Sequence, residues 1–354
     1  MTLAVIGDSQ AVVTAGLASH CGGQTVLLSP GPGRTGPSLR LEGLYSGPIQ
    51  VRVIERPTAD VYIAVSTSAG LEALLAEYRE LLAGRVLLLA PGGFGGAIRA
   101  HRWFRRWGVK PPVIAEATGF PAIGEGEGTI TLRGIKRNLP IAGLDHADTD
   151  EVLTAVRDHL PDVVAADLAT TSMSNTNHLL HPVLMLLNAE RVRRGEQFRL
   201  FREGLPAELE PMLAAADAER LAVVERIGGE PVSITNWLLN FYRDQGMTGT
   251  TITECLTSFP GFAGVQAPTT LEHRYLLDDV PHGIAGYQAV ARQIGVATPE
   301  LDSLISATER LLGRSLQADS SLVRPLLDAA SAAGPAADRS LAGAGTTQSP
   351  KGKS

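Results

Sequence analysis

The chain has 354 residues, with 31 Lys or Arg against 37 Asp or Glu and a formal charge of −6. This length suits two domains, and the slightly acidic balance argues against nucleic acid as a partner. Its two cysteines, Cys21 and Cys255, give neither a disulfide framework nor a metal-ligand spacing, so we expect a reducing compartment and no metal. No apolar run reaches the roughly 18 residues of a membrane span, which predicts a cytoplasmic protein without a membrane partner.

The first residues predict a β-α-β unit. Leu3 to Gly7 is typical of a short buried strand, Ala11 to His20 of the helix that follows, and Thr25 to Leu28 of a second strand. The turn after the first strand reads GDSQAV, whereas a dinucleotide-binding turn carries GxGxxG. Two interpretations stay open: a turn without a ligand, or a cofactor-binding turn in which the Ser9 hydroxyl adds a hydrogen bond. The second makes the cofactor-binding candidates Gly7, Ser9, Gln10 and Ala11.

The end of the second strand bears on the choice of cofactor. An acidic residue there would bind the ribose 2′-hydroxyl of NAD and repel the 2′-phosphate of NADP. The sequence instead reads Ser29-Pro-Gly-Pro-Gly-Arg34, without a carboxylate. This favours NADPH over NADH, with Ser29 and Arg34 as candidate phosphate ligands, although an arginine in an ordinary Pro/Gly turn would look the same.

Strands and helices continue to alternate in the first half. Further strands are predicted at Val61 to Val65, Arg85 to Leu89 and Val113 to Glu116, with a helix around Leu71 to Leu82. This alternation is typical of a Rossmann-like, doubly wound parallel sheet, whose ligands lie at the carboxyl ends of the strands. We therefore expect Ser66, Thr67 and Gly92 to line the cofactor cleft, although βα turns without a ligand also use Gly and Thr.

After Asp150 the patterns become helical, which predicts an all-α second domain. The expected helices are Val152 to His159, the segment around Asn177, Pro206 to Ile227, Trp237 to Tyr242, His282 to Ile294 and Thr298 to Leu312. The final residues are rich in Ala, Gly, Ser and Thr and cannot bury enough surface to offset ordering. The predicted organisation is a dinucleotide-binding domain at 1–150, a helical substrate and catalytic domain at 151–329, and a disordered tail at 330–354. Apolar helical surface in the second half is compatible with a homodimer.

The segment Asn177 to Asn188, NHLLHPVLMLLN, sets polar residues into an apolar run. In a helix, the spacing of four between Asn177 and His181 puts an amide and an imidazole on one face, as a site requires. Pro182 either starts a new helical segment or kinks a longer one. A lone histidine in an apolar helix is also a common core residue, so both interpretations stay open for this segment alone.

Several segments together resemble the octopine/nopaline-type opine dehydrogenase family over about residues 1–315. The resemblance is carried by NHLLHP at 177–182 with LLNAERV after it, FREG at 201–204, DAERL at 217–221, HRYLLDDVPHG at 273–283 and GVATP at 295–299. It implies an NAD(P)H-dependent enzyme that joins an amine, such as an amino acid, to a 2-oxo acid and reduces the imine to a secondary amine. It also implies that His181 and Asp279 handle protons, that Arg274 grips a substrate carboxylate, and that Asn177 holds the carbonyl oxygen or the imine partner.

These residue types suit such chemistry. An imidazole is the side chain best matched to proton transfer near neutral pH, and a carboxylate such as Asp279 on its other nitrogen would fix the tautomer. Arg274 and Asp279 are five residues apart, and a helix stop near Asp278 would let both reach one site. The other interpretation is an Arg/Asp ion pair that closes a turn, with Asp278 or Asp279 as the N-cap of the helix from His282. Phe120 and Trp237 either favour an uncharged amine partner or are ordinary core aromatics. Two other functions stay open: a simple 2-oxo acid or ketone reductase, and a catalytically silent dinucleotide-binding protein.

Overall fold

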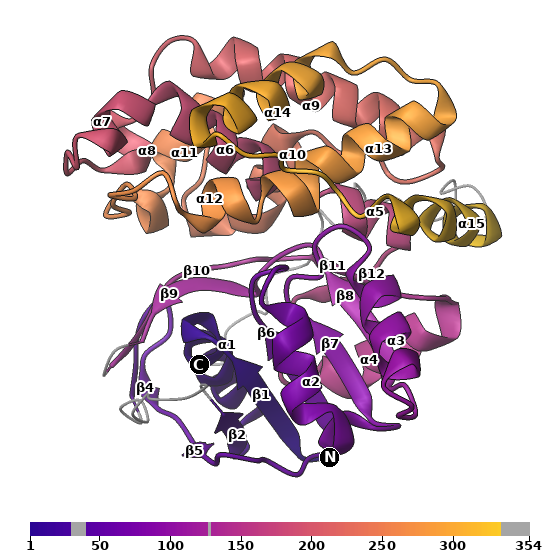
Figure 1. The fold of residues 1–354 in the computed structure, drawn as a ribbon. Helices are drawn as coiled ribbons and strands as arrows, with labels where there is room; N and C mark the ends of the chain where they lie inside the picture. The colour runs from indigo at the N-terminus through magenta and orange to yellow at the C-terminus, as the bar shows by residue number, and fades with distance from the viewer. Residues whose placement is uncertain (30–39, 127–128, 334–354) are drawn as a thin grey trace.

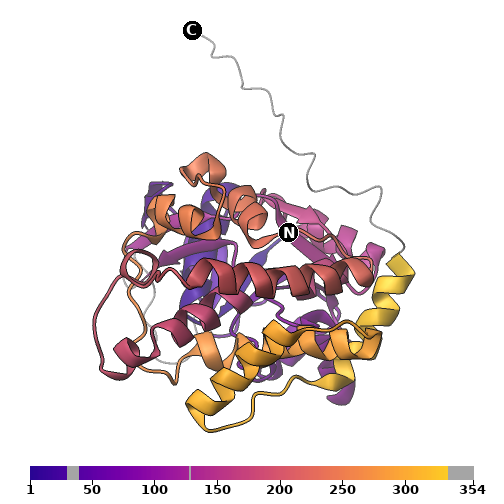
Figure 2. The same ribbon diagram turned by 90° about the horizontal axis from the view of Figure 1, so that it is seen from above.

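The computed structural model describes residues 1–29, 40–126 and 129–333. Figure 1 shows an α/β layer formed by the first half of the chain and a helical layer formed by the second half. In the view turned by 90°, the helices of the second half lie over the sheets (Figure 2). The predicted Rossmann-like domain followed by an all-α domain is confirmed.

An eight-stranded sheet forms the centre of the first domain, with the order β12-β11-β8-β7-β6-β1-β2-β5. Neighbouring strands are parallel except β11, which runs antiparallel to β8. The strands are β1 (Leu3–Gly7), β2 (Val26–Ser29), β5 (Val51–Val53), β6 (Val61–Val65), β7 (Val86–Leu89), β8 (Val113–Ala117), β11 (Leu139–Gly143) and β12 (Val163–Ala165). β1 and β6 are buried along their whole length, because layers cover both faces of the sheet.

A second, four-stranded sheet was not expected from the sequence. Its order is β4-β3-β10-β9, with β3 (Arg40–Gly43), β4 (Gly47–Pro48), β9 (Ala122–Glu125) and β10 (Ile130–Ile135). It packs on helix α1 (Ser9–Gly22), in which Ala11 to Ser19 are all buried. At Gly16 a β-carbon would lie 2.9 Å from Ile130 Cδ1, so a small residue lets helix and sheet approach. Since α1 is covered by both sheets, it is apolar all round.

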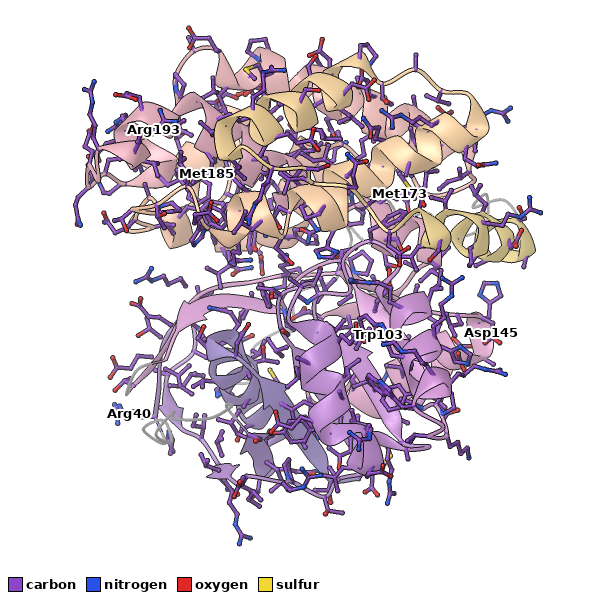
Figure 3. The ribbon with its side chains drawn as sticks, viewed as in Figure 1. Arg40, Trp103, Asp145, Met173, Met185 and Arg193 are labelled. Atoms are coloured by element: carbon purple, nitrogen blue, oxygen red, sulfur yellow. The ribbon has the colours of Figure 1, made fainter. Side chains whose placement is uncertain are left out.

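Each helix belongs to one of the two layers. The first domain contains α1, α2 (Leu71–Leu82), α3 (Gly96–Arg106) and α4 (His146–Val156). The second contains α5 (Leu168–Met173), α6 (Asn177–Leu187), α7 (Ala189–Arg193), α8 (Leu200–Glu203), α9 (Leu209–Arg226), α10 (Ile234–Tyr242), α11 (Ile252–Ser258), α12 (Arg274–Leu277), α13 (Ala285–Ile294), α14 (Pro299–Leu312) and α15 (Val323–Ala333). Met173 and Met185 are buried in this layer, whereas Arg40 and Arg193 project from the surface (Figure 3).

Some expected boundaries shift. The sheet continues past residue 150, because α4 and β12 both belong to the first layer. The helix expected from Val152 begins instead at His146, since the Asp145 side chain caps it by accepting a hydrogen bond from the Asp148 N–H. At the other end, α15 continues to Ala333, beyond the expected start of the tail at residue 330; residues 334–354 lie outside the described part.

Candidate functional site

The turn between β1 and α1 lies where the sheet order reverses, with β2 on one side of β1 and β6 on the other. Ligands of doubly wound sheets bind at this switch point. A β-carbon on Gly7 would lie 1.8 Å from the Val65 carbonyl oxygen, and the φ of Gly7 is +143°, so glycine is required. The retained first glycine of the fingerprint therefore lets the turn pass close to β6, which fits a dinucleotide at this edge.

After Gly7, side-chain hydrogen bonds and a glycine on the facing loop stand in for the other two glycines of the fingerprint. Asp8 caps α1 by accepting a 3.0 Å hydrogen bond from the Gln10 N–H. Ser9 and Ala11 lie in the first turn of α1, and the Gln10 amide donates to the Gly124 carbonyl at 3.2 Å. Val12 stands at the position of the third fingerprint glycine and faces Gly126, at which a β-carbon would lie 2.7 Å from Val12 Cγ1. The glycine is thus on the facing loop rather than on the helix.

The remaining cofactor candidates follow β2 and β6. The Ser29 hydroxyl is 2.7 Å from the Tyr78 hydroxyl and donates to the Glu55 carbonyl at 2.9 Å, so it is already engaged inside the protein. Ser66 and Thr67 follow β6 as expected, and the Thr67 hydroxyl accepts a hydrogen bond from the Gly70 N–H. Arg34 lies outside the described residues.

A cavity with an empty volume of about 1000 Å³, including open solvent at its mouth, lies between the two layers. It brings Gln10 of the first turn of α1 together with three other predicted site residues, Asn177, His181 and Arg274. Part of its wall is aromatic, formed by Phe120, Phe201, Phe241, Tyr242, Phe262 and Tyr275. Trp237 lies outside this lining, and its ring stacks on Phe241 at 5.4 Å. Phe120 is therefore a cavity residue, whereas Trp237 belongs to the core.

His181 and Asp279, 98 residues apart, form a direct contact. His181 Nδ1 is 2.7 Å from Asp279 Oδ2, and both side chains are buried. The Tyr275 ring stacks on the imidazole with a centroid distance of 3.6 Å and fixes its plane. Because Nδ1 is bonded to the carboxylate, Nε2 is the ring nitrogen left for a ligand. Pro182 does not start a new segment, since α6 runs through it from Asn177 to Leu187.

Burial shifts both members of this pair towards their neutral forms. It raises the pKa of Asp279 to about 7, against the opposing charges of His178 and Arg274. Burial, together with Arg274 and Lys136, lowers the pKa of His181 well below its ordinary value. The imidazole is thus unprotonated on one nitrogen near neutral pH and can begin a reaction as a base.

The chain turns sharply between Arg274 and Asp279. Helix α12 ends at Leu277, and a π-helical turn at Val280–Ile284 follows. This break, expected near Asp278, lets Arg274 line the cavity while Asp279 reaches His181 from behind it. The guanidinium of Arg274 lies 5.7 Å from the Phe120 ring centroid and 5.2 Å from that of Tyr275.

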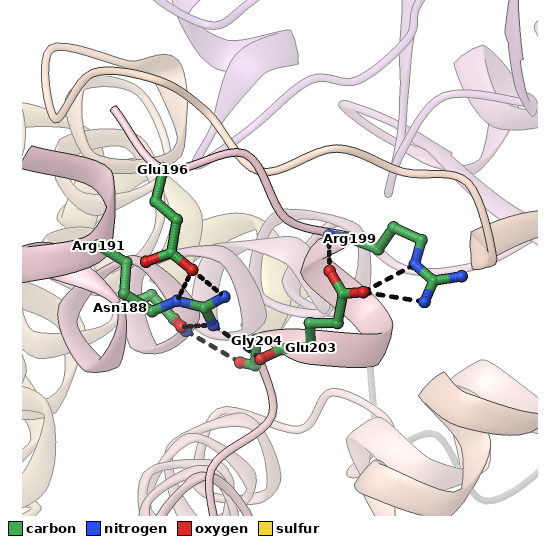
Figure 4. Close-up of polar contacts among 6 residues, drawn as sticks. All are labelled: Asn188, Arg191, Glu196, Arg199, Glu203 and Gly204. Atoms are coloured by element: carbon green, nitrogen blue, oxygen red, sulfur yellow. Dashed lines mark hydrogen bonds and ion pairs between the residues drawn. The ribbon is translucent and has the colours of Figure 1, made fainter. Parts of the chain in front are cut away.

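Two of the other motifs that carry the family resemblance, NAERV and FREG, have a structural role. In the NAERV and FREG segments, Arg191 donates to Glu196 and to the Glu203 carbonyl, and the Asn188 amide donates to the Gly204 carbonyl (Figure 4). This network holds α8, which presents Phe201 to the cavity.

Sequence reasoning missed Lys136, which also lines the cavity and is only 7% exposed. It missed Asp278, whose carboxylate accepts hydrogen bonds from the Ser68 and Ala69 N–H groups of the first domain. His178 was not singled out either; it contacts the Tyr287 hydroxyl at 2.8 Å and is the satisfied core histidine of the segment. The scarcity of lysine was the one usable signal, because the sequence holds lysine at only four positions, 110, 136, 351 and 353.

In the described ranges, no group of three or more His, Cys, Asp or Glu is arranged to hold a metal ion. Within those same ranges, no helix has the length and apolar character needed to cross a membrane.

Comparison with known proteins agrees with this geometry. Residues 164–312 match the family model described as the NAD/NADP octopine/nopaline dehydrogenase, alpha-helical domain. An opine dehydrogenase of Arthrobacter sp. (strain 1C) is 28% identical over 301 residues, covering 82% of each chain. Among solved structures, octopine dehydrogenase with NADH and agmatine has a TM-score of 0.67 at 17% identity, covering 93% of this chain and 96% of that one. NADP⁺-bound yersinopine dehydrogenase has a TM-score of 0.67 at 14% identity, covering 94% and 99%.

Fold and comparisons together define an NAD(P)H-dependent oxidoreductase that acts on a CH–NH group. The helical half of the chain is thus similar to the octopine/nopaline dehydrogenases, and most of the chain is similar to an opine dehydrogenase, as the sequence motifs predicted.

Proposed function

We propose that this enzyme condenses an amine, such as an amino acid, with a 2-oxo acid and reduces the resulting imine to a secondary amine with NADPH. The observation that carries the proposal is the 2.7 Å contact between His181 and Asp279 at a cavity that Arg274 and Asn177 also line. Such a site provides a proton carrier, a carboxylate ligand and an amide in one space. The aromatic wall suits an amine partner with an uncharged side chain.

In this proposal His181 moves protons between the two substrates. The unprotonated Nε2 takes a proton from the ammonium group, which lets nitrogen attack the carbonyl carbon. The same imidazole returns that proton to the former carbonyl oxygen. A second proton from nitrogen follows the same route, the C–O bond breaks, and water leaves. Because both protons of this water come from the ammonium group, one imidazole is enough for the condensation.

The other residues position the substrates and stabilise the charged form of His181. Asp279 stabilises the imidazolium that forms at each transfer and keeps the proton of Nδ1 in place. Arg274 holds the carboxylate of the 2-oxo acid with its planar fork, and Asn177 donates to the carbonyl oxygen. Bound NADPH supplies the hydride that reduces the imine carbon.

The preference for NADPH over NADH is part of the proposal. It is supported by the absence of a carboxylate from Ser29 to Arg34 in the sequence. Comparing kcat/KM for the two cofactors tests it, and equal or better use of NADH would contradict it. A cytoplasmic location and a homodimer also stay predictions; light scattering of the purified chain tests the second.

The reaction is tested by following NADPH absorbance with panels of 2-oxo acids and amines, separately and together. Oxidation that requires both partners, with a secondary amine identified by mass spectrometry, supports the proposal. Oxidation with the oxo compound alone would instead identify a 2-oxo acid or ketone reductase. Folded protein that binds NADPH but turns over no combination would identify a catalytically silent binding protein.

A further inference from the structure

Three cationic side chains line the cavity: Arg133, Lys136 and Arg274. Arg133 is paired with Glu125. Within the part of the chain that the structure describes, neither Lys136 nor Arg274 forms an ion pair with a carboxylate. A buried ammonium without a counter-charge is costly, so its presence calls for a ligand that supplies one.

The position of Lys136 is fixed by its neighbours rather than by a partner of its own. Before it, the Ile135 N–H donates to Gln245 Oε1 at 2.8 Å, and Gln245 Nε2 donates back to the Ile135 carbonyl at 2.7 Å. After it, Arg137 pairs with Asp162 at 2.6 Å and with Asp244 at 2.9 Å. The backbone of Lys136 is therefore held across the two layers, which preorganises the ammonium group.

Space for the ammonium group is provided by the facing loop. A β-carbon on Gly119 would lie 2.1 Å from Lys136 Nζ, so any larger residue would displace it. The loop from Gly119 to Ala122 has no polar side chain. On its other side the ammonium lies 5.1 Å from the Phe241 ring centroid. Burial lowers the pKa of Lys136 to about 8, and a bound anion would reverse that shift.

We propose that Lys136 is a specificity-determining residue that binds the carboxylate of the amino acid substrate. The inference rests on the proposed function, in which Arg274 holds the carboxylate of the 2-oxo acid. Arg274 lies beside the Tyr275 ring that stacks on His181, whereas Lys136 enters the cavity from the end of β10 in the other layer. The two cations come from different layers, so each can hold one of the two carboxylates that flank the new C–N bond.

The kinetic test compares Lys136→Met with Lys136→Arg, which keeps the charge, and with the exposed Lys110→Met as control. Lys136→Met should raise the KM for the amino acid roughly 10- to 100-fold, which is the usual worth of a charge-assisted hydrogen bond, and leave the KM for the 2-oxo acid within about threefold. Lys136→Arg should recover most of this loss, and Gly119→Ala should reproduce it. The decarboxylated amine should have the same KM with the wild type and with Lys136→Met.

Several results would overturn the assignment: an unchanged KM for the amino acid in Lys136→Met, an increase confined to the 2-oxo acid, or an equal increase for both substrates with a lowered Tm. An unchanged KM in Gly119→Ala would also oppose it.

A readout without turnover separates this inference from the proposed function. Cyanate carbamoylates unprotonated lysine, and peptide mass spectrometry distinguishes Lys136 from Lys110. With NADP⁺ present, amino acids should protect Lys136 but not Lys110, whereas the decarboxylated amines should protect neither. Protection without turnover in the wild type would support the carboxylate site while contradicting the proposed reaction. Equal labelling of Lys136 with and without amino acids would overturn the site.

Discussion

Asp278 and Asp279 are adjacent in sequence but bind opposite parts of the molecule. Asp278 accepts hydrogen bonds from the Ser68 and Ala69 N–H groups at 3.1 and 2.8 Å, ahead of helix α2 of the first domain. Asp279 contacts His181 of the second domain at 2.7 Å. The break between α12 and the π-helical turn makes this divergence achievable. One short segment thus joins the loop that follows β6 to the proposed proton carrier.

Replacing Asp278 should loosen this connection. Asp278→Ala removes two hydrogen bonds to a carboxylate, which should lower the free energy of unfolding by about 2–4 kcal/mol. Because the freed N–H groups lie on the loop that follows Ser66 and Thr67, the Kd for NADPH should also rise, on the order of tenfold. Calorimetry and urea unfolding measure both, with the exposed Asp158→Ala as control. An unchanged NADPH affinity would show that the contact is only structural.

Replacing His181 should separate chemistry from binding. His181→Ala should lower kcat roughly 10²- to 10⁴-fold, the usual contribution of a positioned acid or base, while NADPH binding stays within about threefold. Asp279→Asn should have a similar effect, because its amide can donate to Nδ1 and would move the ring proton to Nε2. Single-turnover kinetics with saturating substrates measures this. Retention of most of the wild-type kcat by either variant would exclude the pair from proton transfer.

The local pattern of apolar residues was sufficient to predict several strands of the main sheet and the helix between two of them. The strands Leu3–Gly7 and Val61–Val65 and the helix Leu71–Leu82 lie where the apolar periodicity predicted them. Only β10, ITLRGI, has a short alternation of apolar and polar residues. The second sheet was not predicted from the sequence, because its other strands, RLEG, GP and AIGE, are short and hold glycine and charge. They form strands because they cover α1, which is a tertiary effect.

The site residues likewise include some that local spacing predicted and some that only the folded chain brings together. Asn177 and His181 were predicted to share a helix face by their spacing, and both line the cavity. No periodicity connects His181 with Asp279, 98 residues later, so only the family motifs indicated that pair. The sequence did not indicate Lys136 as a site residue, because its burial without a counter-charge depends on three separate segments: the Gly119 loop, Gln245 and Phe241. Such a feature exists only in the folded chain.

The buried ion pair of the DAERL segment should be far more important for stability than an exposed pair of similar length. Arg220 pairs with Asp217 at 2.7 Å, with 2% and 6% of their side chains exposed, and also donates to two carbonyls. Arg220→Met should cost about 3–5 kcal/mol, because Asp217 stays buried without its counter-charge. Arg324 pairs with Asp328 at 2.9 Å but is 80% exposed, so Arg324→Met should cost at most about 1 kcal/mol. Urea unfolding of both variants measures this, and similar losses would contradict the role of burial.

Lys136 should lower stability in the absence of substrate, because its ammonium group is buried without a counter-charge. Its pKa falls from an ordinary value of 10.5 to about 8 on burial, which corresponds, at about 1.4 kcal/mol per unit, to about 3 kcal/mol. Lys136→Met should therefore be more stable than the wild type by up to about this amount at pH 7.

The pH dependence of that difference identifies its cause. Between about pH 8 and 10.5 the unfolded lysine binds a proton that the folded one does not, so wild-type stability rises with pH in this window and the gap to Lys136→Met closes. The other titratable groups at the cavity are present in both proteins, and burial lowers the pKa of His181 and raises those of Tyr242 and Tyr275, away from this window. Urea unfolding of both proteins from pH 7 to 10.5 measures the gap. If the gap is constant with pH, or if Lys136→Met is the less stable protein, the ammonium group is not buried without a partner.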